Sequence, residues 1–118
     1  MTAEQLLGAA RKLLHDGGIS AGWRALAVAT LSRQALETAI DDYWLRAAPG
    51  GEGAPRTIQL LCLPSYIDET TAELAFQTWA LLSGACHVRA YDLAPSPEEL
   101  SVWLTDASAV IAGLGAAT

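Results

Sequence analysis

Apolar residues recur at three- and four-residue spacing along most of the chain, which is the period of an amphipathic helix. The first such stripe consists of Leu6, Leu7, Ala10, Leu13 and Leu14. Thr2 and Gln5 stand at capping-box spacing before it, and His15 followed by two glycines marks its end. The pattern predicts a first helix over residues 3–15.

The second predicted helix, residues 20–46, is the longest. Its large apolar positions are Trp23, Leu26, Leu31, Leu36, Ile40, Tyr43 and Trp44. They cover more than one narrow stripe, so we expect this helix to be contacted from two sides. Residues 48–56 follow with three glycines and two prolines, which predict a flexible loop without regular structure.

Three further helices are predicted at residues 58–63, 70–88 and 97–113. The short apolar run 57–63 is assigned to a helix because the chain offers no second strand to pair with it. The next helix begins at Asp68 or at Thr70, which has Glu73 at capping-box spacing, and its buried face is predicted to contain Ala72, Ala75, Phe76, Trp79, Leu82 and Cys86. Ser96, Pro97 and two glutamates mark the start of the last helix.

These elements predict an all-α fold in which residues 1–118 form a single domain. Four main helices and a short fifth would pack as an up-and-down bundle, and the chain is long enough to enclose one core. We expect the four tryptophans, Trp23, Trp44, Trp79 and Trp103, to fill the core and the seam between two copies. A ligand pocket lined by tryptophan is the alternative.

Composition adds an expectation of self-association. Hydrophobic residues make up 52% of the chain and charged residues 17%, which is more apolar than a small monomer can bury. We therefore expect a homodimer with an interface of roughly 1,200 Å² or more. The longest apolar run, residues 25–29, is too short to span a membrane, and the first residues do not resemble a secretion signal, so we expect a cytoplasmic protein. The two cysteines, Cys62 and Cys86, are interpreted as buried thiols.

The net charge of −6 argues against non-specific DNA binding, because that binding depends on neutralising phosphates. Six of the seven basic residues are arginines, so a local cluster that contacts RNA stays open.

Two groups of residues are candidates for a site. Arg33, Glu37 and Asp41 are spaced four apart, which aligns them on one helix face. They could bind a cation or serve acid–base chemistry, but a solvated or salt-bridged face is the preferred interpretation. No metal-binding motif, phosphate-binding loop or nucleophile motif is present, so we expect neither a metal nor a cofactor.

The second group follows the fourth helix and contains His87, Arg89 and Tyr91. A histidine can transfer protons near neutral pH and an arginine can hold a phosphate, which together would suit metal-free RNA cleavage. The alternative is that His87 and Arg89 interact with the last carbonyls of that helix.

The segments Ser32-Arg-Gln-Ala-Leu-Glu37 and Trp79-Ala-Leu-Leu-Ser-Gly-Ala-Cys-His87, followed by Pro95-Ser-Pro-Glu-Glu99, resemble those of HEPN-superfamily bundles. The resemblance covers roughly residues 20–114. It implies an α-helical, dimerising protein of the kind found in toxin–antitoxin and antiviral systems, where some members are RNases and others are non-catalytic binding modules.

The catalytic signature of that family is an arginine separated from a histidine by four to six residues. His87 matches the histidine, but Ala80, Leu81 and Leu82 stand where the arginine belongs. We therefore expect a non-catalytic homodimeric module that binds a protein partner. The alternative is a divergent metal-free ribonuclease that uses His87 and Arg89 on RNA.

Overall fold

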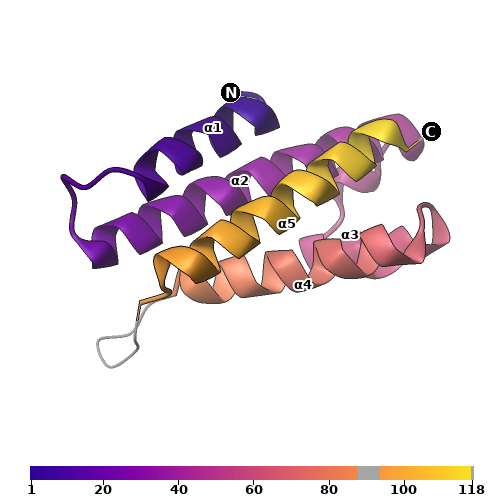
Figure 1. The fold of residues 1–118 in the computed structure, drawn as a ribbon. Helices are drawn as coiled ribbons and strands as arrows, with labels where there is room; N and C mark the ends of the chain where they lie inside the picture. Colours follow the sequence, from indigo (N-terminus) through magenta and orange to yellow (C-terminus); the bar gives the residue numbers. More distant parts are fainter. Residues whose placement is uncertain (88–93, 118) are drawn as a thin grey trace.

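The chain folds into helices joined by short connections, and the residues that the structure describes, 1–87 and 94–117, form no strand. In this computed structural model the helices are α1 Ala3–Leu14, α2 Ala21–Ala47, α3 Arg56–Cys62, α4 Glu69–Ala85 and α5 Pro97–Ala116. Two 3-10 turns, η1 at Gly51–Gly53 and η2 at Leu63–Ser65, flank α3. The all-α prediction is confirmed for this part of the chain (Figure 1).

The central element is α2, against which α1, α4 and α5 all pack (Figure 1). Its buried residues are Ala25, Val28, Ala29, Ser32, Ala35, Leu36, Ala39, Ile40, Tyr43 and Trp44. The prediction that this helix is contacted from two sides is confirmed. The neighbours that cover it belong to the same chain, so its two-sided apolar pattern needs no second copy.

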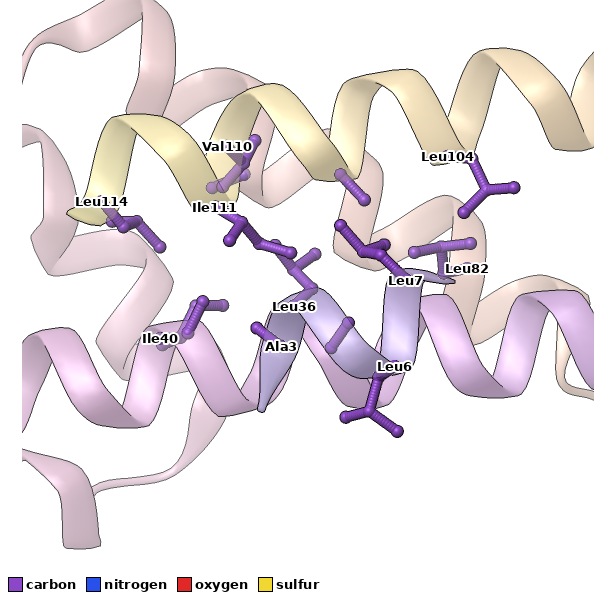
Figure 2. Packing of buried hydrophobic residues seen from close by; sticks show 14 of the residues in the cluster. Ala3, Leu6, Leu7, Leu36, Ile40, Leu82, Leu104, Val110, Ile111 and Leu114 are labelled. Atoms are coloured by element: carbon purple, nitrogen blue, oxygen red, sulfur yellow. The ribbon is translucent and has the colours of Figure 1, made fainter. Parts of the chain in front are cut away.

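The core extends between all the main helices, and one part of it lies where α1, α2 and α5 meet. Figure 2 shows side chains from all three helices, among them Leu7, Leu36 and Ile111, gathered in this space. Each of these three side chains is buried. Burying one such side chain stabilises the folded state by about 1.5–3 kcal/mol, so this contact accounts for much of what holds α1 and α5 to α2.

Side-chain caps begin four of the five described helices. The predicted capping box of Thr2 with Gln5 and the predicted Ser96 cap are both confirmed, and Glu99 adds a capping box at Ser96 that the sequence analysis did not predict. For α4 the two possible starts are resolved: Asp68 is the N-cap, and its Oδ2 accepts the Thr71 N–H at 2.9 Å. The predicted capping box from Thr70 is wrong, because Thr70 already lies inside the first turn.

The segment 48–56 is more ordered than the sequence predicted. It contains the turn η1, and α3 begins within it at Arg56, so the expectation of no regular structure is wrong. Gly50 has φ of 99°, a conformation that a side chain would strain. A Cβ on Gly51 would lie 3.2 Å from the Trp44 ring. The glycines thus permit a tight turn packed against α2 where the sequence suggested a loose one.

Phe76 and Cys62 are two corrections to the predicted core. Phe76 is 37% exposed, because the buried stripe of α4 runs through Ala72, Ala75, Thr78 and Leu82. Phe76 stands one position beyond Ala75 and is therefore rotated to the edge of that stripe. Cys62 is exposed on the outer side of α3, and Cys86 is only partly buried.

The four tryptophans differ in how far the chain itself buries them. Trp44 is buried, Trp79 and Trp103 are partly buried, and Trp23 is 68% exposed near the start of α2. Only Trp44 therefore fills the core completely. Among the described residues, no helix combines the length and apolar character that crossing a membrane requires.

Candidate functional site

The predicted row of charged side chains on α2 takes part in an ion cluster that includes α3. Arg33 Nε lies 3.6 Å from Glu37 Oε1, one turn further along α2. Arg56, the first residue of α3, places Nη1 2.6 Å from Asp41 Oδ1 and Nε 3.5 Å from Glu37 Oε2. Two carboxylates therefore face two guanidinium groups, and the charges balance within the cluster.

Two more side chains complete this cluster. Trp79 of α4 donates its indole N–H to Glu37 Oε2 at 3.3 Å. Gln59, 2% exposed, accepts from Arg56 Nη1 at 2.7 Å and donates through Nε2 to the Gly51 carbonyl at 2.8 Å. The salt-bridged face preferred from the sequence is confirmed, and it joins α2, α3 and α4. In the ranges that the structure covers, no three His, Cys, Asp or Glu side chains gather as metal ligands would.

Arg56 was missed by the sequence reasoning. It stands 15 residues after Asp41, in a segment predicted to be a loop, so no helical spacing related the two residues. The available signal was the pair Arg56 and Gln59, which lie three apart at the start of a short helix.

His87 lies directly after the C-cap residue of α4 and is exposed. Its backbone N–H donates to the Gly84 carbonyl at 3.1 Å, which continues the helical path by one more bond. Arg89 and Tyr91, the other two members of the predicted group, lie outside the described residues. Of the three positions where the HEPN signature places its arginine, Ala80 and Leu81 are exposed and Leu82 is buried.

Four arginines are engaged inside the molecule. Arg24 donates to the carbonyls of Asp16 and Ile19, which holds the connection between α1 and α2. Arg46 donates to the Leu114 carbonyl at 3.0 Å at the end of α5. With Arg33 and Arg56 in the ion cluster, these side chains stabilise connections and helix ends, and their positive charge is not directed at a ligand.

A hollow of about 580 Å³ lies between the start of α1, the second half of α2 and the end of α5. It is open to solvent and lined by Glu4, Asp42 and Arg46, and Arg46 donates to the carbonyls of Leu114 and Ala117 at the end of the chain. Its walls thus hold the chain ends together and do not converge on a ligand.

An exposed apolar surface on α3 and its neighbours is the strongest candidate for a binding site. We call it the α3 patch; it consists of Ile58, Leu61, Cys62, Tyr66 and Phe76. Leu61 is 61% exposed and Ile58 is 49% exposed, although both belong to a helix of only seven residues. Large apolar side chains gathered on one exposed surface are characteristic of contact sites.

A hollow lies on each side of α3. The first has a volume of about 180 Å³, and Trp44, Ile58, Cys62 and Tyr66 are among its lining residues. The second, about 430 Å³, is a groove between α3 and α4 whose lining includes Leu61, Pro64 and Phe76. The helix α3 thus forms a ridge between two hollows, and side chains of a partner can pack into such hollows.

The α3 patch is apolar because the polar side chain of Gln59 points toward the interior, not toward solvent. Gln59 and Leu60 point inward, and the hydrogen bonds of Gln59 to Gly51 and Arg56 fix that orientation. Ile58 and Leu61 then necessarily face outward. Apolar residues stand on all sides of the short run from Thr57 to Leu63, and its one glutamine would be expected to face solvent, so the sequence did not reveal this surface.

Acidic residues border the α3 patch on the α4 side. Glu73 lines the groove beside Leu61 and Phe76, and Glu69 lies exposed one turn before it. Asp68 caps α4, and hydrogen bonds from the backbone N–H and side chain of Thr71 lower the pKa of its carboxyl.

Comparisons with family models, curated proteins and solved structures found no match to this chain. The likeness to HEPN bundles therefore remains a prediction from short motifs. The function is therefore inferred from the apolar and charged residues on the surface of the protein.

Proposed function

We propose that this protein is a non-catalytic binding module, HEPN-like in sequence, that contacts a protein partner through the α3 patch. The observation that carries the proposal is the outward position of Ile58 and Leu61 between two apolar hollows. Burying a Leu or Ile side chain is favourable by about 1.5–3 kcal/mol relative to leaving it exposed. A partner that covers the α3 patch gains this free energy, whereas the free protein does not.

The non-catalytic part of the proposal is supported by the placement of charge. Proton transfer by His87 needs a second cationic group aimed at a phosphate, and the family arginine is absent. Arg24, Arg33, Arg46 and Arg56 are all held by acceptors within the chain. The metal-free ribonuclease that uses His87 and Arg89 is therefore the less supported function.

Further parts of the proposal follow from the sequence. We infer an up-and-down bundle in which α3 is the short fifth helix, supported by the packing of α1, α4 and α5 against α2. The resemblance and the composition suggest a cytoplasmic, regulatory role in a toxin–antitoxin or defence setting. The homodimer expected from composition would need a surface other than the buried faces of α2, since α1, α4 and α5 already cover these within the chain.

The experiment compares the wild type with the double variant Ile58→Ala/Leu61→Ala. Both substitutions remove exposed apolar atoms without changing charge, and Val102→Ala, exposed on α5, is the matched control. Self-association is measured by light scattering, and binding of an uncharged amphipathic helical peptide by fluorescence anisotropy. We expect the wild type to show at least one of these associations, the double variant to lose it and Val102→Ala to keep it. A wild type that shows neither association contradicts the proposal.

A further inference from the structure

We propose that the α3 patch receives a cationic amphipathic helix of another protein in preference to a second copy of this chain. This inference rests on the proposed binding function and specifies its partner. It follows from the distribution of charge over the molecule and from the shape of the surface around α3.

The whole net charge of the protein resides in its second half. Residues 1–56 contain six acidic and six basic residues, and are therefore neutral. Residues 57–118 contain seven acidic residues and one arginine, Arg89, a net charge of −6. Of the two helices that build the α3 patch, α4 lies in this acidic half and contains no basic residue, whereas α3 begins with Arg56 at the border between the halves.

The acidic groups lie where they face a ligand on the α3 patch. Glu73 forms part of the groove beside Leu61 and Phe76. Glu69 is exposed one turn before Glu73, which places both on one face of α4, and Asp68 caps the same helix. Arg56, the cation nearest in sequence to the patch, is paired with Asp41 and Glu37. A ligand on this surface therefore meets apolar side chains bordered by carboxylates.

A helix fits this surface better than an extended segment. The described residues contain no strand, so they offer no sheet edge to which a peptide strand could be added. The groove lies between α3 and α4, which lie side by side in Figure 1. Side-chain ridges of a third helix pack into grooves of this kind, with apolar residues every three or four positions.

A second copy fits the electrostatics poorly. Two copies joined through their α3 patches would bring Asp68, Glu69 and Glu73 of each close to the same groups of the other. Like charges across an interface oppose binding, and salt reduces that repulsion. A cationic helix is instead attracted, and salt weakens the attraction. The two occupants therefore respond to ionic strength in opposite directions.

The test uses three helical peptides with one apolar face of leucines and a polar face of lysine, glutamine or glutamate. Binding to the full chain is measured by fluorescence anisotropy at low and at moderate salt. We expect the lysine peptide to bind more tightly than the glutamate peptide by about tenfold or more at low salt, with a smaller ratio at higher salt. Ile58→Ala/Leu61→Ala should weaken all three peptides, and Val102→Ala none.

Charge variants locate the preference on the structure. Glu69→Gln/Glu73→Gln should reduce the preference for lysine over glutamate severalfold. Glu4→Gln/Glu98→Gln removes the same amount of charge away from the patch and should change that preference much less. A light-scattering measurement of the free protein at both salt concentrations accompanies the titrations.

Each outcome separates the two levels of the proposal. Equal binding of the three peptides, lost in Ile58→Ala/Leu61→Ala, overturns the cationic partner and leaves the binding function intact. A dimer that salt strengthens and that excludes the lysine peptide identifies a second copy as the occupant and also overturns it. Absence of both peptide binding and self-association overturns the binding function itself.

Discussion

The helices α1 and α3 use their apolar residues in opposite ways. In α1 the residues Leu6, Leu7, Ala10 and Leu14 are buried against the core, and exposed positions such as Glu4 and Arg11 are polar. In α3 the polar Gln59 is buried, while Ile58 and Leu61 are exposed. The helix starts differ as well, because a capping box closes the start of α1 and no side chain caps α3.

This contrast separates apolar residues that hold the fold from apolar residues that are free to bind. The leucines of α1 already have their contacts in the free protein. The position of α3 depends on Arg56, Gln59 and the buried Leu60, so Ile58 and Leu61 are left for a partner. The same leucine-to-alanine substitution should therefore have very different effects on stability in the two helices.

The largest expected effect is that of Leu7→Ala in α1. Removing this buried leucine should lower the free energy of unfolding by about 2–5 kcal/mol, through lost burial and the cavity that remains. The matched substitution Leu61→Ala in α3 should change it by only about 0.5 kcal/mol or less. Urea denaturation of both variants measures the difference, and equal losses would contradict the contrast between the helices.

The next effect is that of Gln59→Ala, which tests what orients α3. The substitution removes the donor to the Gly51 carbonyl and the acceptor for Arg56, and should cost about 1–3 kcal/mol. Gln77→Ala, at an exposed position of α4, is the control and should be nearly neutral. If both variants unfold at the same urea concentration, Gln59 does not anchor the helix.

A smaller effect concerns the cap of α4. Because hydrogen bonds to Thr71 lower the pKa of Asp68, its carboxylate stabilises the folded state above its unfolded pKa of about 3.9. This contribution to stability is lost as the pH falls through the lower pKa that Asp68 has in the folded state. Asp68→Asn keeps a capping side chain but not the charge. The variant should therefore be less stable than the wild type at neutral pH, and the two proteins should become equally stable in acid. Thermal unfolding at several pH values measures this difference.

The smallest expected effect is that of His87→Ala. The side chain is exposed just beyond α4, so the free energy of unfolding should change by less than about 0.5 kcal/mol. We also expect no metal-independent RNA cleavage above background in either protein. Robust cleavage by the wild type that disappears in His87→Ala would favour the ribonuclease and remove the reason to prefer a binding module.

The predictions from sequence were most accurate where local physics decides the structure. Thr2 with Gln5 and Ser96 with Glu99 marked helix starts, because a cap depends on residues only three positions apart. The apolar stripe of α1 and the two-sided pattern of α2 likewise follow from helical period alone. The same reasoning placed Arg33, Glu37 and Asp41 on one face and preferred a salt-bridged interpretation for them.

The sequence by itself determined the all-helical class and the positions of the main helices, since backbone hydrogen bonds and side-chain period act between near neighbours. Only the tertiary structure decided that Arg56 pairs with Asp41, that Gln59 faces inward and that Phe76 lies at the edge of α4. Each of these outcomes depends on how one helix is rotated against another. In a helix of only seven residues such as α3, periodicity does not specify that rotation, so its exposed surface was decided only by the packing of the whole chain.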